Sequence, residues 1–159
     1  MTVPGEGPAA DVRAPYAFPL AEDQPGWNRW VPAPEGFNAM FGPVLIRREG
    51  EGPRVRLRAQ PDLGWMNPRG VGHGGAIAGY IDSVGFLAWY FLSPGDFRAA
   101  TVDLQIQYLA PVIIEKPVDA VVEITKETGK LVFASGRIEQ ENEVAAAFMI
   151  CLRKIKAPR

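Results

Sequence analysis

The chain has 159 residues, of which 47% are hydrophobic and 22% charged, so it is long enough for one domain with a buried core and too short for two. Its 17 Lys and Arg residues nearly balance its 18 Asp and Glu residues. This balance excludes an overall field that attracts nucleic acid or an acidic membrane surface, so an anionic partner must be bound by local charges.

Three features favour a soluble, cytoplasmic protein. Cys151 is the only cysteine, which excludes an intrachain disulfide and favours a small buried side chain in a reducing compartment. Residues 1–13 lack the basic start and the apolar stretch of a secretory signal. The apolar run from Ala76 to Leu92 is shorter than the ~20 residues of a membrane span and contains Asp82.

Residues 1–36 are predicted to form a proline-rich N-terminal arm, and residues 37–159 the folded domain. The arm contains seven prolines and four glycines, which break both helices and sheet ladders. Its second half also carries aromatic side chains, too many for a purely solvated tail. We therefore expect part of the arm to pack on the domain, either as surface cover or as a lid over a ligand pocket.

The next segment predicts a short helical turn over residues 36–42, followed by a hairpin of two strands over 44–49 and 53–60. The second strand alternates cleanly between apolar residues and arginines. The three arginines, Arg54, Arg56 and Arg58, are expected either to be ordinary solvated strand residues or to receive phosphate groups.

A long apolar helix is predicted from about Gly74 to Phe91, closed by the breakers Ser93, Pro94 and Gly95. Four runs with strand character follow, over residues 100–109, 118–125, 131–140 and 144–155. In the first run, strict alternation sets Val102, Leu104, Ile106 and Tyr108 against Thr101, Asp103, Gln105 and Gln107. Short connections make most strands antiparallel, which predicts an α+β fold of one sheet around one helix.

Several familiar chemistries do not fit. Gly70, Gly72 and Gly75 formally match a dinucleotide-binding GxGxxG, but no strand precedes them and the later strands offer no parallel βαβ unit. No GxSxG nucleophile elbow is present. One histidine and one cysteine make no metal-ligand set. We therefore predict no cofactor and no metal.

The remaining candidate chemistry is an oxyanion site beside a carboxylate. Gly74 and Gly75 lie at the predicted helix N-terminus, where backbone N–H groups and about half a positive charge face a polarised carbonyl oxygen. Asp82 lies within the apolar helix and could act as a nucleophile or as a general base on water. The alternative is a core carboxylate capped by a hydroxyl group.

The spacing between these groups predicts a shared site. Eight residues of helix separate Gly74 from Asp82 by about 12 Å, too far for both to act on one carbonyl group. Two antiparallel copies of the helix would bring Gly74 of one subunit beside Asp82 of the other, which predicts a homodimer. One side of the helix carries a stripe rich in glycine, which comprises Gly75, Gly79, Asp82, Gly85 and Trp89. Such a stripe suits a close partner helix or an acyl chain, although accidental glycines remain an alternative.

These residues resemble the hotdog-fold acyl-CoA thioesterases, in the branch that includes the phenylacetate-pathway enzyme and the thioesterase-superfamily-member proteins. That branch has an asparagine, a glycine, HGG and then an aspartate nine residues after the histidine, which here are Asn67, Gly70, His73-Gly74-Gly75 and Asp82. A second block, a hydroxyl residue and a strand ending in proline, matches Thr101 to Pro111. The resemblance covers about residues 36–156.

The resemblance implies a sheet curled around a central helix, a dimer with a continuous sheet, often paired into tetramers, and hydrolysis of acyl-CoA. Asp82 would be the nucleophile or general base, and the Gly74 amide would polarise the thioester carbonyl. Asn67 and His73 would orient the site, His73 by a ring hydrogen bond that holds the turn. Thr101, where the family often has serine, would position water or Asp82.

Two functions remain open at this point. The first is an acyl-CoA thioesterase, and the second is a hotdog protein that binds acyl-CoA without hydrolysing it. Asp82 and Thr101 favour the enzyme, because a pure binder has no evident need for a carboxylate beside the scissile bond. A hotdog hydratase needs an Asp/His pair at a different spacing, which the single histidine does not provide.

Overall fold

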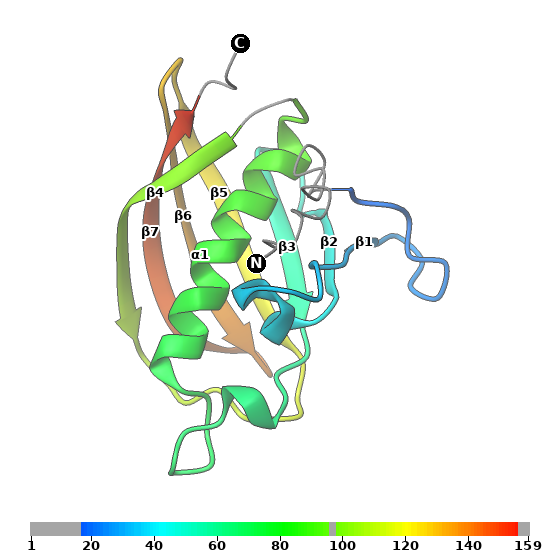
Figure 1. The fold of residues 1–159 in the computed structure, drawn as a ribbon, viewed down its shortest axis with the longest axis vertical. Coiled ribbons are helices and arrows are strands. Elements are labelled where there is room, and N and C mark those ends of the chain that lie inside the picture. The colour runs from blue at the N-terminus through cyan, green and yellow to red at the C-terminus, as the bar shows by residue number, and fades with distance from the viewer. Residues whose placement is uncertain (1–16, 96–97, 156–159) are drawn as a thin grey trace, which may run out of the picture.

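One long helix lies in the concave face of a curved antiparallel sheet (Figure 1). A computed structural model describes residues 17–95 and 98–155 of the chain. In chain order the elements are β1 (Asn28–Trp30), the 3-10 helix η1 (Phe37–Phe41), β2 (Val44–Arg48), β3 (Arg54–Ala59), the 3-10 helix η2 (Leu63–Trp65), α1 (Gly74–Leu92), β4 (Arg98–Tyr108), β5 (Val118–Glu127), β6 (Leu131–Gln140) and β7 (Glu143–Ile155). The predicted α+β architecture of one sheet around one helix is confirmed.

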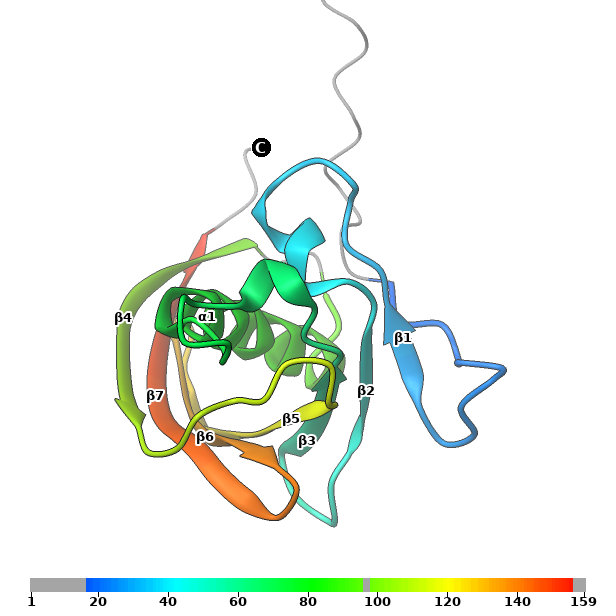
Figure 2. The same ribbon diagram turned by 90° about the horizontal axis from the view of Figure 1, so that it is seen from below.

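The sheet has the strand order β1-β2-β3-β5-β6-β7-β4, and every neighbouring pair is antiparallel. Figure 2 shows how it wraps around α1, with β4 at one end and β1 at the other. The wrap buries most of the helix. Large side chains of α1, among them Tyr80, Ile81 and Leu87, pack against the concave face of the sheet with no more than 1% of their surface exposed. Burial of this apolar surface is the main favourable contribution to folding.

By length and composition, α1 is also apolar enough to cross a membrane, with a mean hydropathy of 1.3 over an 18-residue stretch of its 19 residues. In the structure, however, 61% of that stretch is buried inside the fold. The sheet therefore covers the surface that makes the helix so apolar.

The predicted strict alternation of the first strand after the helix is wrong at its start. The pairing of β4 with β7 shifts between Thr101 and Asp103, so Val102 is an extra residue in a β-bulge. Val102 is 58% exposed, whereas Thr101 hydrogen-bonds to the helix. Because one extra residue reverses the facing of every side chain before it, Thr101 lies on the same side as Leu104 and Ile106.

The arginines of β3 are not simply solvated, as one of the two sequence interpretations had them. Arg56 donates to Glu49, Asp119 and Glu139, and its side chain is only 16% exposed. Arg58 makes two hydrogen bonds to Asp119. Burial raises the pKa of the Asp119 carboxyl, but the hydrogen bonds from Arg58 and Arg56 lower it by more than burial raises it. The pKa of Asp119 therefore lies below the usual value. Because carboxylates already occupy these guanidinium groups, the alternative of a phosphate site here loses its basis.

Part of the predicted arm packs on the domain. Its described portion begins at residue 17, and residues 1–16 lie outside the described residues. Trp27 is 7% exposed and stacks against the guanidinium groups of Arg47 and Arg58 at 4.4 and 5.2 Å from the ring centroid. The next residues form β1, which pairs with β2. This half of the arm therefore covers the outer face of the sheet and extends its edge.

Close packing between β5, β6 and β7 leaves no room for a side chain at Gly136. A Cβ there would lie less than 3.0 Å from the Val121 carbonyl oxygen and from the Phe148 ring. The backbone oxygen cannot move without breaking the β5–β6 ladder. We therefore expect Gly136→Ala to lower the free energy of unfolding by about 2 to 3 kcal/mol, as measured by urea denaturation. Gly129→Ala is the matched control, because nothing lies within 4 Å of a Cβ there. Equal stability of the two variants would contradict this packing.

Candidate active site

The turn that precedes α1 is held by Asn67. The Asn67 side-chain oxygen accepts hydrogen bonds from the amides of Arg69 at 2.8 Å and Val71 at 3.4 Å. The backbone N–H of Asn67 donates to the Val71 carbonyl. Such side-chain contacts fix the loop much as a backbone turn does. On its far side the loop is tied to Val112, whose carbonyl accepts from the Gly72 amide at 2.8 Å. Asn67 thus shapes the loop that leads to the helix start.

His73 is the N-cap of α1. Its Nδ1 accepts a hydrogen bond from the Gly75 amide at 2.9 Å, and its own amide donates to the Trp65 carbonyl at 2.6 Å. For Nδ1 to accept, the neutral ring must carry its proton on Nε2. The expectation that His73 holds the turn by a ring hydrogen bond agrees with this geometry. The cap uses one of the unpaired amides of the first helical turn and leaves another, that of Gly74.

The Gly74 amide has no acceptor among residues 17–95 and 98–155. It lies in the first turn of α1, where the partial positive charge of the helix dipole is concentrated. A carbonyl oxygen placed there would receive a free N–H donor at the positive end of the helix. These are the properties of one part of an oxyanion site.

Tyr108, which the sequence interpretation did not select, lies directly beside this amide. Its hydroxyl donates to the Gly74 carbonyl at 2.7 Å, and a Cβ on Gly74 would touch the Tyr108 ring at 3.5 Å. The residue is 52% exposed at the end of β4. The signal in the sequence was an aromatic residue three positions before the Pro111 of the second family block. Tyr108 therefore ties the end of β4 to the start of α1 and forms one wall of the turn.

Asp82 and Thr101 form the second group of candidate residues. The Thr101 hydroxyl donates to Asp82 Oδ1 at 2.5 Å. In the single chain Asp82 is half-buried and Thr101 is exposed, so the pair lies at an accessible surface and not inside the core. The bulge at Val102 is what turns Thr101 toward the helix. One oxygen of Asp82 is thus held by a hydroxyl group, and the other is left for a ligand.

The structure places the candidate residues in two separate groups along α1. Asn67, His73, Gly74 and Tyr108 gather at its N-terminus, while Asp82 and Thr101 lie two turns further on. Because α1 is regular from Gly74 to Leu92, the helical rise still puts about 12 Å between Gly74 and Asp82. One chain therefore carries two half-sites and not one complete site.

One face of α1 remains without full cover from the rest of the described chain. We call it the open face; its residues are Gly75, Ala78, Asp82 and Phe86, none of which is fully buried. The predicted glycine stripe only partly coincides with it, because a Cβ on Gly79 would lie 2.5 Å from the Phe37 ring of η1. Gly85 and Trp89 are buried under the sheet, where Ile150 would be 2.8 Å from a Cβ on Gly85. Gly85 is thus explained by a strand of its own chain and not by a partner helix or an acyl chain.

No group of three or more metal-ligating side chains occurs among the described residues, 17–95 and 98–155. The chemistry open to the two half-sites is therefore that of a carboxylate, a hydroxyl group and a free backbone amide. These groups suit attack on an activated carbonyl carbon, with the amide accepting the charge that develops on the oxygen.

A comparison with protein families finds that residues 69–147 match the model of the thioesterase superfamily. The matched stretch contains α1 and both half-sites except Asn67. A search of curated proteins finds no significant match.

Solved structures show the same fold at low sequence identity. A thioesterase of Haemophilus influenzae superposes with a TM-score of 0.65 and 22% identity, over 75% of this chain and 82% of that chain. Thioesterase superfamily member 2 of Mus musculus gives 0.57 and 22%, over 68% and 80%. A hypothetical thioesterase of Streptococcus pneumoniae, solved with coenzyme A, gives 0.63 and 14%, over 73% and 88%. The fold of this chain is therefore the hotdog fold.

The His73 cap predicts a specific effect on stability. His73→Ala removes the acceptor for the Gly75 amide, and we expect it to lower the free energy of unfolding by about 1 kcal/mol. His73→Asn keeps a good N-cap and is expected to stay within about 0.5 kcal/mol of the wild type. Urea denaturation measures both. If the alanine and asparagine variants lose the same stability, the ring does not act as a cap.

Proposed function

Residues 69–147 place the chain in the thioesterase superfamily, and from that premise we propose that it is an acyl-CoA thioesterase. It hydrolyses the thioester bond to a carboxylic acid and CoA. The observation that carries the proposal is the contact between Thr101 and Asp82, which holds a carboxylate on the open face of α1. A carboxylate held at an accessible surface, with one oxygen unused, is suited to chemistry more than to stability.

In this proposal Asp82 activates the attack and the Gly74 amide receives the charge. Asp82 either takes a proton from water, whose oxygen then attacks the thioester carbon, or attacks that carbon itself. The carbonyl oxygen becomes negative and accepts a hydrogen bond from the Gly74 N–H. The carbon–sulfur bond then breaks, the sulfur leaves as the CoA thiolate, and it takes up a proton. In the second route, water hydrolyses the acyl-aspartate to restore Asp82.

The second part of the proposal is that two chains complete each site. Gly74 and Asp82 of one chain lie too far apart for one carbonyl group, whereas a two-fold axis near Ala78 would set each beside its counterpart. The open face supports this, because Gly75 and Ala78 are small enough for a second helix to approach closely. The edge strand β4 supports it too, since within the described part of the chain its 11 residues pair only with β7. We propose a homodimer with two equivalent sites, which could pair further into a tetramer.

The choice of CoA esters as substrates is supported by the structural relative from Streptococcus pneumoniae that was solved with coenzyme A. A protein that bound acyl-CoA without hydrolysing it would need the fold and the turn. It would not need Thr101 to hold a carboxylate on the open face. This is why we favour the enzyme over the binder.

The test is a free-thiol assay over a panel of acyl-CoA substrates. We expect Asp82→Asn to lower kcat at least about 100-fold, because a positioned base contributes two or more orders of magnitude. Thr101→Val is expected to lose about tenfold, since it leaves the carboxylate without its hydrogen bond, and Thr101→Ser to stay within about threefold.

Asp103→Asn is the matched control, because Asp103 is an exposed carboxylate of β4 that accepts a hydrogen bond from Gln105 and not from the helix. It should retain wild-type activity. Wild type that binds CoA esters but releases no thiol from any of them would establish the binder instead. Full activity of Asp82→Asn would exclude the role given to the carboxylate.

A further inference from the structure

Most cations of the described chain are already neutralised. Ion pairs occupy eight of the basic side chains among residues 17–95 and 98–155: Arg29, Arg47, Arg54, Arg56, Arg58, Lys116, Arg137 and Lys154. Across these same residues, the basic side chains without an ion pair are Arg48, Arg69, Arg98, Lys126, Lys130 and Arg153. A net charge of −1 offers an anion no general attraction, so these are the groups available to bind one.

All of the unpaired cations except Arg69 gather at one end of the sheet, near the C-terminus of α1. Lys130 and Arg153 line one pocket there, while Arg48 and Lys126 line a second pocket beside Leu92 and Ser93. Arg98 pairs with Ile155, which lines the first pocket. The side chains come from β2, β4, β5, β7 and the turn between β5 and β6, so the clustering is a product of the fold and is not visible as a run in the sequence.

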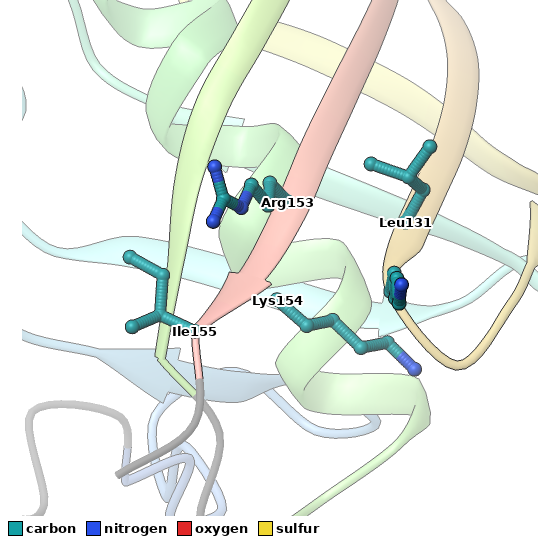
Figure 3. Close-up of a pocket in the computed structure, with 5 residues that line it drawn as sticks. Leu131, Arg153, Lys154 and Ile155 are labelled. Atoms are coloured by element: carbon teal, nitrogen blue, oxygen red, sulfur yellow. The ribbon is translucent and has the colours of Figure 1, made fainter. Parts of the chain in front are cut away.

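The first pocket has the form of a shallow groove of about 570 Å³. Figure 3 shows its walls, with Arg153 and Ile155 extending from β7 on one side and Leu131 from β6 on the other. Leu131 and Ile155 make part of it apolar, and Lys130 and Arg153 supply exposed charge. Glu127, which lines the second pocket, is bound to Lys154.

We propose that this groove, which we call the cationic groove, binds the phosphate-bearing adenosine end of CoA. The inference rests on the proposed function and gives that site its missing contacts with the charged part of the substrate. An arginine and a lysine match the phosphate groups, since guanidinium can donate two parallel hydrogen bonds and ammonium adds a compact charge. The apolar side chains Leu131 and Ile155 suit the flat face of an adenine ring.

The position of the groove relative to Asp82 also fits a long substrate. Thr101, which holds Asp82, pairs with Leu152, and both face α1, whereas Arg153, the next residue along β7, faces the outer side of the sheet. Arg98 lies three residues before Thr101, or roughly 10 Å along the strand. CoA carries its phosphates at the end remote from the thioester. The groove therefore lies on the outer face of the sheet, at the end of β4 nearer to the carboxylate half-site, and an extended pantetheine arm would pass around the end of the sheet to join the two.

The test compares two charge-neutralising double variants of the full chain. Lys130→Gln/Arg153→Gln removes the two cations of the groove, and Lys116→Gln/Arg137→Gln removes two exposed cations that are paired elsewhere. We expect the dissociation constant of CoA, measured by calorimetry, to rise about tenfold or more in the first variant, the size of one lost charge-assisted hydrogen bond or more. It should stay within about twofold in the second.

Truncated probes identify the ligand. Hydrolysis of an acyl-pantetheine, which lacks the phosphates and adenosine, should have the same kcat/KM in wild type and in Lys130→Gln/Arg153→Gln. Inorganic phosphate should bind far more weakly than CoA, because it lacks the adenine. If it binds equally well, the groove is a site for free phosphate and the proposal fails.

An unchanged dissociation constant for CoA in Lys130→Gln/Arg153→Gln would overturn the cationic groove and leave the thioesterase proposal standing. A second result would also distinguish the cationic groove from the thioesterase proposal. Weaker CoA binding in that variant, in a protein whose wild type releases no thiol, would support the groove and reject hydrolysis.

Discussion

The rise of the α-helix separates the two groups of candidate catalytic residues, and the arrangement of the proposed site depends on that separation. At about 1.5 Å per residue, the eight residues from Gly74 to Asp82 span about 12 Å, and α1 is regular over that whole stretch. The free amide at the helix start and the carboxylate two turns later therefore cannot meet in one chain. The sheet covers α1 on the other sides but leaves the open face accessible, so the same geometry that separates the half-sites exposes the surface on which a second chain would complete them.

The edge strand β4 is the element that connects the fold to the chemistry. At one end the bulge at Val102 turns Thr101 toward Asp82, and at the other end Tyr108 reaches the Gly74 carbonyl. A single strand thus contacts both half-sites, in the antiparallel sense relative to α1. A change in the register of β4 would displace Thr101 and Tyr108 together, because residues of one strand move as a unit. Its unpaired edge and the cationic groove at its beginning make β4 central to both proposals.

Periodicity predicted the large elements, because it depends on residues close in the chain. The helix was expected from Gly74 to Phe91 and ends at Leu92, and the hairpin of β2 and β3 was also expected. The bulge at Val102 was missed because nothing local marks it, since it arises where β4 pairs with β7. The partners of Arg56 come from positions 49, 119 and 139, and the five unpaired cations near the C-terminus of α1 come from five parts of the chain. Reasoning from the helix selected Gly74 and Asp82, and the family resemblance added Asn67, His73 and Thr101, but neither selected Tyr108, whose place depends on how β4 crosses the helix.

The central claim is that each site takes Gly74 from one chain and Asp82 from another. It is tested by mixing Asp82→Asn with Gly74→Pro. Proline suits the first helical position, and His73 at φ −68° and ψ 132° already has the extended backbone that a following proline requires, so only the N–H is lost. Each variant alone should be inactive, with Gly74→Ala, which keeps the amide, as the active control. Random mixing should restore about a quarter of wild-type activity, because half of the dimers are mixed and each has one intact site. No recovery in a mixture whose subunit exchange is shown by mass spectrometry would contradict the shared site.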